Sequence, residues 1–264
     1  MIKITGNTHS YSNEMEAAFQ IKEKLIKEWP DIEESEDDNI SIMISAHLTT
    51  GKNREIDLIV TGNFKNPKKI KPRNHEMCTI YPEKRNSKGE VISPAKEISS
   101  DEIFIENFFI IIECKKVPPK NLKIENGKLL VKYPDKPFYD NVTEQSSQQL
   151  FSLKKHLGNQ LYFKKLDSNK RSIPFIFNMI YLQDISDDDK RSGVVKVFQK
   201  NHSWADIAQS MIRQISDFGR LNPKKYDEKV ICSAFDAEHA EYLMGEKYLL
   251  SKEFSDLDQI QMAR

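Results

Sequence analysis

The amino-acid sequence predicts an α/β fold in which helices flank a mixed central sheet. Residues 12–29 have the periodicity of an amphipathic helix, and residues 40–48 and 54–61 alternate apolar and polar side chains as hairpin strands do. Residues 104–115 contain the run FFIII, which indicates a strand buried on both faces, as in the centre of a sheet. This order of elements, continued by a further helix and strand, is typical of an α/β sandwich.

The first helix is expected to begin after Ser12, whose side chain is suited to cap it, and to end at Pro30. An acidic first turn favours the same start. Its inner face is apolar: Ala18, Ile21 and Leu25, widened by Phe19, Ile26 and Trp29. The acidic stretch DIEESEDD that follows is expected to be a solvated loop, and TTGKN a turn between the hairpin strands.

Residues 62–103 are rich in Lys, Pro, Asn and Ser, and we expect an irregular insertion there. Beyond the central strand, Asn126-Gly127 lies between two apolar runs in residues 122–132, a pattern typical of a type I′ hairpin. Periodicity predicts the remaining elements: helices at 141–157 and 203–218, strands at 173–182 and 194–198, and mostly helical structure at 226–250.

The composition limits the class of protein and its compartment. The chain carries 40 Lys+Arg and 40 Asp+Glu, so any nucleic-acid binding must depend on local patches. The three cysteines lack metal or disulfide spacing and fit a reducing cytosol, and the six histidines lack zinc-site spacing. No apolar signal-peptide core opens the sequence, and the longest apolar run, 108–112, is too short to span a bilayer. We therefore expect a cytoplasmic protein with no membrane partner.

Three charged residues stand out within apolar strand segments: Asp57, Glu113 and Lys115. Glu113 and Lys115 are two residues apart and therefore lie on the same face of their strand. Burying such charges is costly, and a divalent cation would compensate for it. Mg²⁺ is commonly held by one or two carboxylates, water and phosphate, so Asp57 and Glu113 are the candidate metal ligands. Lys115 is placed to orient or deprotonate an attacking water and to stabilise a charged transition state.

The alternative interpretation is that each of these residues is an ordinary strand charge, since Glu-x-Lys is very common in proteins. An Asp inside an apolar strand is rarer. The combination of an acidic helix, the hairpin with Asp57 and the apolar strand that ends at Lys115 is more specific than any of its parts, and it favours a metal-dependent hydrolytic site.

The segments REIDLIV and FFIIIECKK, in this order, resemble the PD-(D/E)XK nuclease superfamily, and within it the nuclease-related domain called NERD. The resemblance covers roughly residues 12–182. It implies a restriction-endonuclease-like core and Mg²⁺- or Mn²⁺-dependent hydrolysis of phosphodiester bonds in DNA, in DNA processing or in defence against phage and other foreign DNA. The insertion at 62–103 is longer than the family pattern and is a departure from it.

The resemblance also implies a Glu on the first helix as part of the catalytic site. Glu14 matches it best, because it shares the face of Ala18 and its apolar neighbours. Glu16 is the alternative, although it lies further round the helix.

A Gln on the second helix is the other residue that the resemblance implies. The family's Asn-Pro-x-x-Gln motif is matched by Asn141 and Gln145, with Val142 in the place of the Pro. Gln148 and Gln149 are alternatives for Gln145 as the catalytic-site residue.

Two clusters of basic residues lie in the insertion. The cluster that we expect to bind the DNA phosphate backbone contains Lys68, Lys69, Lys71 and Arg73, with Lys65 beside them. The second contains Lys84, Arg85 and Lys88. A lysine-rich loop is more often simply solvated, but an origin between the two strands that carry the proposed ligands favours the functional interpretation.

We expect a core domain over residues 1–200 and a helical C-terminal extension over residues 201–264. Within this extension, residues 254–261 resemble the short Gln-containing segment that precedes the ATP-binding loop of UvrD-like helicases. That likeness implies a helicase partner, in the same longer chain or separate from it. A non-catalytic nucleic-acid-binding or docking module with the same fold, and an RNA-directed nuclease, are the competing interpretations.

Overall fold

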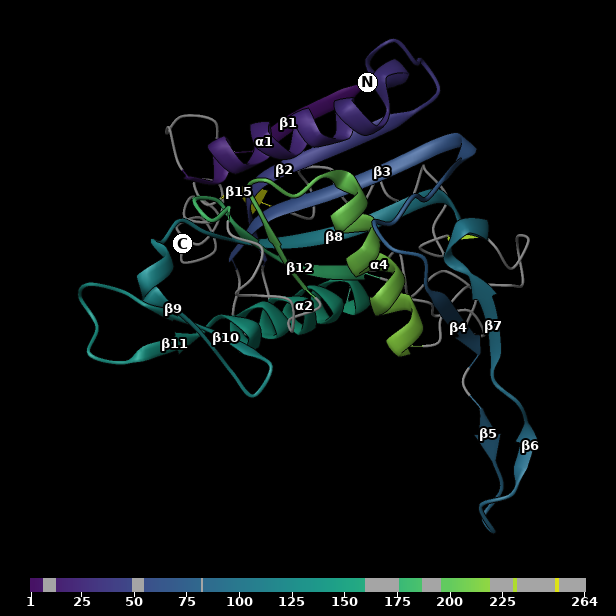
Figure 1. Cartoon of the computed structure of the whole chain (residues 1–264). Helices are drawn as coiled ribbons and strands as arrows, with labels where there is room; N and C mark the ends of the chain where they lie inside the picture. The colour runs from purple at the N-terminus through teal and green to yellow at the C-terminus, as the bar shows by residue number, and fades with distance from the viewer. Residues whose placement is uncertain are drawn as a thin grey trace.

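The computed structural model describes residues 1–6, 13–48, 55–81, 83–159, 176–186, 196–218, 230–231 and 250–251. Its centre is a mixed sheet with the strand order β1-β2-β3-β8-β12-β13 (Figure 1). The strands are β1 (Ile2–Gly6), β2 (Asn39–His47), β3 (Glu55–Lys69), β8 (Phe104–Lys115), β12 (Ile176–Leu182) and β13 (Val197–Gln199). Two short strands, β14 (Val230–Ile231) and β15 (Leu250–Ser251), pair with β8 and β2.

The sheet is antiparallel in its middle and parallel toward both sides. Strand β3 runs antiparallel to β2 and β8, whereas β1 is parallel to β2, and β12 is parallel to both β8 and β13. The α/β class and the mixed sheet are therefore confirmed. The antiparallel pairing also places the start of β3 beside the end of β8, which is where the sequence put Asp57 and Glu113.

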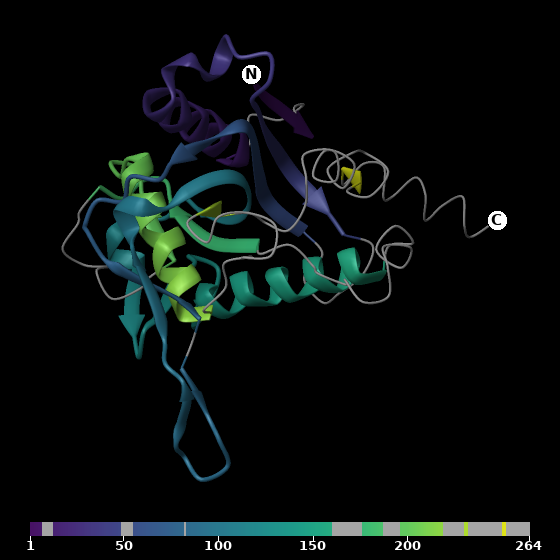
Figure 2. The same ribbon diagram turned by 90° about the vertical axis from the view of Figure 1, so that its right-hand side faces the viewer.

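Helices cover both faces of the sheet (Figures 1 and 2). Helices α1 (Asn13–Glu28) and α4 (Trp204–Phe218) contribute to the main core cluster on one face, and α2 (Val142–Asn159) packs on the other. All three were expected from periodicity. Because α4 belongs to the main core, the core continues past residue 200, where a helical extension was expected to begin. Within the described ranges, no helix is both long and apolar enough to cross a membrane.

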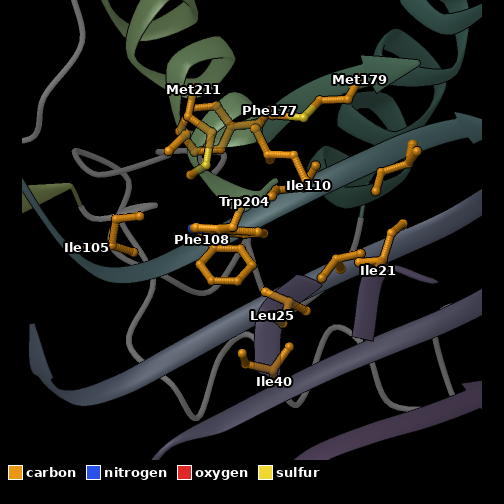
Figure 3. Close-up of a cluster of buried hydrophobic side chains, with 14 of the residues drawn as sticks. Ile21, Leu25, Ile40, Ile105, Phe108, Ile110, Phe177, Met179, Trp204 and Met211 are labelled. Atoms are coloured by element: carbon orange, nitrogen blue, oxygen red, sulfur yellow. The ribbon is translucent and has the colours of Figure 1, made fainter. Parts of the chain in front are cut away.

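An aromatic cluster joins α1 and α4 to the sheet (Figure 3). The ring of Trp29 lies 4.9 Å from that of Phe64 and 5.0 Å from that of Trp204, and Phe108 lies 5.7 Å from Trp204 between ring centroids. Gly62 faces Phe108 across the β3–β8 pair, and a Cβ at this position would lie 2.1 Å from the Phe108 ring. Glycine is therefore required for this ring to lie flat against β3.

The segment 62–103 is not the irregular insertion that its composition predicted. Strand β3 continues to Lys69, and four strands follow: β4 (Met77–Tyr81), β5 (Lys84–Arg85), β6 (Val91–Ser93) and β7 (Lys96–Ser99), before the short 3-10 helix η2 (Ser100–Glu102). They pair as β4–β7 and β5–β6, and the β5–β6 ribbon projects from the body of the molecule (Figures 1 and 2). The base of this arm is tied to α4, since Arg213 Nε donates to Glu76 at 2.9 Å and the Thr79 N–H donates to Ser216 Oγ at 3.2 Å.

A separate three-stranded sheet lies next to the end of β8. It consists of β9 (Leu122–Glu125), β10 (Lys128–Lys132) and β11 (Tyr139–Asn141), after the 3-10 helix η3 (Pro119–Asn121). The turn between β9 and β10 has φ of 50° at Asn126 and 70° at Gly127. A type I′ turn requires positive φ at both central residues, so the hairpin prediction is confirmed.

Other details differ from the sequence-based expectations. Strand β1 was not expected, and the acidic stretch after α1 contains a 3-10 helix, η1 (Pro30–Glu33), that buries Ile32. Where helical structure was expected at 226–250, the described residues form the short strands β14 and β15. The turn at 49–53, the start of the strand expected at 173–182 and the tail at 254–261 lie outside the described residues.

Candidate active site at the ends of β3 and β8

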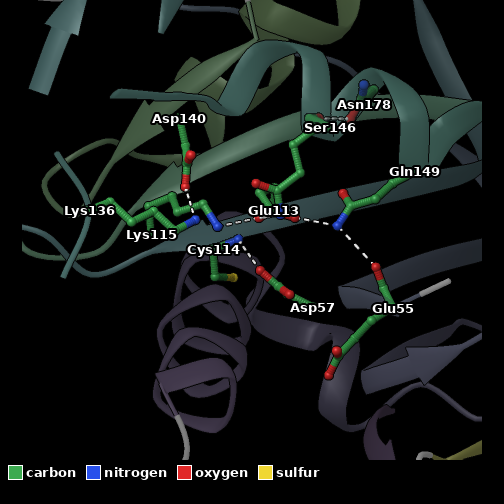
Figure 4. A network of polar contacts seen from close by, with 11 residues as sticks. Glu55, Asp57, Glu113, Cys114, Lys115, Lys136, Asp140, Ser146, Gln149 and Asn178 are labelled. Atoms are coloured by element: carbon green, nitrogen blue, oxygen red, sulfur yellow. Dashed lines mark hydrogen bonds and ion pairs between the residues drawn. The ribbon is translucent and has the colours of Figure 1, made fainter. Parts of the chain in front are cut away.

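The site begins with two carboxylates on adjacent strands (Figure 4). Leu58 is paired with Ile112, so the next residues outward along the two strands are Asp57 and Glu113. The backbone N–H of Cys114 donates a hydrogen bond of 2.7 Å to Asp57 Oδ2. Strand pairing and this bond together fix Asp57 at the end of β8.

Glu113 is buried, with 1% of its surface exposed, and its two carboxylate oxygens have protein partners. Lys115 forms an ion pair with Oε1, and Gln145 Nε2 donates to the same oxygen at 2.6 Å. Gln149 Nε2 donates to Oε2 and, at 3.0 Å, to the backbone carbonyl of Glu55. Gln145 and Gln149 are four residues apart on α2, so both face Glu113 from one side of that helix.

The close packing of these charged groups determines their pKa values. Burial, together with the negative charge of Glu113, raises the pKa of Asp57 to about 8. Burial alone would lower the pKa of Lys115, but the Glu113 and Asp57 carboxylates outweigh it and hold that pKa above its ordinary value. Two carboxylates and one ammonium thus share a confined space, with an excess of negative charge when both acids are ionised.

The entry to α2 explains why its glutamines point at Glu113. The Asn141 side chain accepts a 3.1 Å hydrogen bond from the Glu144 N–H, and Glu144 accepts one from Asn141 Nδ2 at 3.2 Å. Asn141 therefore caps the helix, and its side-chain bond to Glu144 helps to fix the start of α2. Val142 is the first residue of the helix, the position that proline favours, so its replacement of the family's Pro leaves the helix start in place.

The first helix supplies a further carboxylate near the site. The charge of Glu14 contributes to the raised pKa of Asp57, whereas Glu16 forms an ion pair of 2.8 Å with Lys116. Glu14 is therefore electrostatically coupled to the site, and Glu16 is engaged elsewhere. Among the second-helix alternatives, Gln148 donates to Glu144 on its own helix at 3.3 Å.

Sequence reasoning missed one residue that joins these elements. Gln183, directly after β12, donates its N–H to the Lys115 carbonyl at 3.0 Å and its Nε2 to the Asn13 carbonyl at 2.6 Å. It ties the start of α1, which carries Glu14, to the end of β8. Its buried Oε1 has no hydrogen-bond partner within the part of the chain that the structure describes. No motif signals this residue, since its role depends on parallel pairing of β8 and β12.

The basic cluster of the insertion lies at the opposite end of the same strands. Lys68 and Lys69 pair with Ile105 and Phe104 at the start of β8, roughly 30 Å along the sheet from Asp57. An origin between the two ligand-bearing strands therefore does not bring these lysines to the proposed ligands, and phosphate binding by the cluster stays a prediction. The long β3 strand carries it away from them.

Two members of the cluster are also neutralised by carboxylates. Lys68 lies 2.9 Å from Asp38, and Arg73 lies 2.8 Å from Asp206. Lys71 lies at the end of the extended segment and contributes a positive charge near Glu28. Half of the cluster, Lys68 and Arg73, thus takes part in ion pairs with the acidic stretch and with α4.

The candidate metal ligands suit a hard divalent cation, because they are carboxylates and because two of them lie on adjacent strands. Among the described residues, no three or more His, Cys, Asp or Glu gather into a metal-holding group. Asp57 and Glu113 nevertheless offer two carboxylates from adjacent strands, and Mg²⁺ commonly takes one or two, with water and phosphate completing its shell. Burial and the neighbouring Glu113 carboxylate both oppose the ionisation of Asp57, and a cation held between the two carboxylates would counter the second of these effects.

Comparison of the chain with models of protein families, with characterised proteins and with solved structures found no match. The residues of the site are therefore the basis for assigning a function.

Proposed function

We propose that the chain is a metal-dependent nuclease that hydrolyses phosphodiester bonds in DNA, using Mg²⁺ or Mn²⁺. The observation that carries the proposal is the buried Glu113–Lys115 ion pair beside Asp57, at the ends of two adjacent central strands. A buried ion pair with an additional carboxylate costs stability, and such arrangements are concentrated at functional sites.

The arrangement of the elements supports a restriction-endonuclease-like core of the NERD type. The chain order α1, β2, β3, β8, α2, β12 is the order that the resemblance implies: a helix, a hairpin, the Glu-x-Lys strand, a Gln-bearing helix and a further strand. The carboxylates and glutamines come from the elements on which that family pattern places them.

Each residue has a defined part in this proposal. Asp57 and Glu113 would hold the ion, which when bound would supply Lewis acidity and a more acidic water. Gln145 and Gln149 orient the Glu113 carboxylate. Lys115 stays protonated at neutral pH, because its pKa is raised, so it serves as a hydrogen-bond donor to negative charge on the phosphate.

The test is an incubation of the purified chain with plasmid, linear duplex and single-stranded DNA, in Mg²⁺, in Mn²⁺ and in EDTA. We expect cleavage in either metal and none in EDTA. Asp57→Asn should lose cleavage and bind Mg²⁺ or Mn²⁺ more weakly in calorimetry, because an amide is a weaker ligand for a hard cation. Metal-independent cleavage, or unchanged metal affinity in Asp57→Asn, would contradict the proposal.

A second candidate function is a non-catalytic nucleic-acid-binding or docking module. The closed network around Glu113 favours it, because Lys115, Gln145 and Gln149 already occupy both carboxylate oxygens. Nucleic-acid binding without hydrolysis in any metal would select this function. A parallel incubation with RNA separates a ribonuclease from a deoxyribonuclease.

We place the activity in DNA processing or defence against foreign DNA, in the cytoplasm and alongside a UvrD-like helicase. This part of the proposal depends on the likeness of residues 254–261, which lie outside the described residues. Co-purification of a helicase, or a helicase domain in the natural chain, is the observation that tests it.

A further inference from the structure

A patch of aromatic and basic side chains lies on the small sheet beside the candidate active site. This aromatic platform consists of Lys132, Tyr133, Lys136, Phe138 and Tyr139. Phe138 is 59% exposed and Tyr139 is 40% exposed, so neither ring is part of a core. Large exposed rings gathered in one place are a common mark of an interaction surface.

The lysines of the platform are paired with its rings. The ammonium of Lys136 lies 5.5 Å from the centroid of Tyr133 and 5.9 Å from that of Phe138, and the ammonium of Lys132 lies 6.0 Å from that of Tyr139. Asp140 holds Lys136 in this position at 2.6 Å. Each ring therefore has a cation beside it, and this arrangement offers a flat apolar surface and a positive charge together.

The platform is linked to the site by an electrostatic interaction and by the course of the chain. Tyr133 is among the groups that raise the pKa of Lys115. Tyr139 lies in β11, which leads directly into α2, where Gln145 contacts Glu113.

The segment that contains the platform is more positively charged than the chain as a whole. Residues 116–141 contain six lysines against three carboxylates, in a chain whose net charge is zero. A partner that satisfies both the rings and the charge must present flat faces and a repeated negative charge. Single-stranded DNA does so, because its bases are free to stack on aromatic side chains while its phosphates meet lysines. Duplex DNA keeps its base faces inside the stack.

We propose that the aromatic platform binds single-stranded DNA and directs it to Lys115. The inference rests on the proposed nuclease function and narrows its substrate to DNA with a single-stranded end or gap. Bases stack on Phe138 and Tyr139, Lys132 contacts phosphates, and the adjoining phosphodiester lies at the Glu113–Lys115 end of β8.

Binding is measured by fluorescence anisotropy of the full chain with a labelled oligothymidylate, in EDTA so that cleavage is excluded. We expect the single strand to bind more tightly than a duplex of equal length. The double variant Phe138→Ala/Tyr139→Ala should bind the single strand at least about tenfold more weakly, since each stacked base contributes about 1–3 kcal/mol. Lys132→Gln should lower the salt dependence by about 0.7 in the log–log slope.

Matched variants test whether weaker binding is specific to the platform or follows from the removal of any exposed aromatic ring. Phe19→Ala and Phe151→Ala remove rings that are 53% and 69% exposed on α1 and α2, and both should bind like the parent. Phe138→Tyr and Tyr139→Phe keep the rings and should also bind normally. Equal loss in the Phe19 variant, parent-like binding by the double variant, or no preference for the single strand would overturn the inference.

The two proposals fail in different ways. Platform-dependent binding in EDTA without cleavage in Mg²⁺ or Mn²⁺ would reject the nuclease function and leave the binding site standing. Cleavage that is equally fast in parent and double variant at limiting single-stranded substrate would reject the platform and leave the nuclease standing.

Discussion

The two ends of the β3–β8 strand pair differ in how their charged side chains are buried and balanced. At one end, the side chain of Glu113 is fully buried and that of Lys115 is 12% exposed, with Asp57 beside them. At the other end, Lys68 on β3 forms an ion pair with Asp38, and their side chains are 32% and 9% exposed. One end of the strand pair therefore holds an unbalanced group of buried charges, and the other a balanced pair that solvent reaches in part.

The pKa values show the consequence of this difference. Burial and the charge of Glu113 raise the pKa of Asp57, so the folded chain resists its ionisation. Burial alone would raise the pKa of Asp38, but hydrogen bonds from Lys68 and from the Lys65 N–H outweigh it and lower that pKa. Buried groups whose charge is opposed in this way are concentrated at functional sites, and the contrast between Asp57 and Asp38 is therefore one of the observations that support the proposed function.

The largest effect is expected from removing the ammonium at the confined end. Lys115→Ala should slow cleavage by about 10²–10³, the usual loss when one donor to developing charge is removed. Lys116→Ala is the matched control, because Lys116 is adjacent but pairs with Glu16 at the surface. Single-turnover kinetics in Mg²⁺ measure both, and a near-parent rate in Lys115→Ala would remove Lys115 from the mechanism.

The second largest difference between the two ends of the strand pair is expected in the free energy of unfolding. Lys115→Ala leaves Glu113 buried without its cation, a change that typically costs about 3–5 kcal/mol. Lys68→Ala should cost less, because Asp38 keeps the hydrogen bond from the Lys65 N–H and Lys68 itself is partly exposed. Urea denaturation in EDTA measures both free energies of unfolding. Adding Glu113→Gln to Lys115→Ala should recover much of the loss, and equal losses at the two ends would contradict the comparison.

The pH dependence of Asp57 provides a third test. From its ordinary value near 3.8 up to about 8, the folded chain holds a proton on Asp57 that the unfolded chain releases. The folded state thus binds more protons, and stability falls as pH rises through this window, by up to about 1.4 kcal/mol per unit. Asp57→Asn should remove this slope, so its gain in melting temperature in EDTA should be larger at high pH. A gain that shrinks as pH rises would show that Asp57 is not the source.

The ionisation of Asp38 should make stability depend on pH in the opposite direction to that of Asp57, and by a smaller amount. Its lowered pKa means that the ionised carboxylate stabilises the fold above its ordinary value near 3.8, and that this contribution is lost as pH falls through the folded pKa. Asp38→Asn should therefore lower the melting temperature at neutral pH and have little effect in acid. An effect that persists unchanged in acid would point to packing instead of charge.

The smallest effect is expected from the basic cluster. Neutralising Lys68, Lys69 and Lys71 together should lower the salt slope of DNA binding by less than the roughly 0.9 per contact of true phosphate ligands, because Lys68 already pairs with Asp38. Anisotropy titrations at several salt concentrations measure it. A loss equal to three contacts would mean that DNA lies along the whole length of β3.

Local pattern predicted the elements whose signals are complete within one segment. Helix α4, the β9–β10 turn and the buried strand β8 were expected because periodicity, Asn126-Gly127 and the FFIII run each specify a structure by themselves. Strands β4 to β7 were missed because each is only two to five residues long and lies in a segment rich in Lys, Pro, Asn and Ser. The base of the arm is held to α4 by hydrogen bonds from Thr79 and to Glu76, and α4 lies more than a hundred residues later in the chain.

The residues of the candidate active site could be predicted only in part, because elements far apart in the sequence bring some of them together. Asp57, Glu113 and Lys115 could be singled out because charges are rare within apolar strands. The sequence could not choose between Gln145 and Gln149, and the structure places both at Glu113 because four residues span one helical turn.

Glu14 was preferred to Glu16 from local periodicity, because Glu14 shares the apolar face of the first helix. The partner of Glu16 could not be predicted in the same way: Lys116, directly after β8, lies a hundred residues later in the chain, and such an ion pair has no local signal.

The hydrogen bond from the Cys114 amide to Asp57 gives the site its own spectroscopic reporter. The chemical shift and exchange rate of a backbone amide depend on the charge of the atom that accepts its proton. The Cys114 amide resonance should therefore follow the protonation of Asp57 in a pH titration and respond when a cation takes over that carboxylate. One assigned peak would thus record the occupancy of the site without substrate and without turnover.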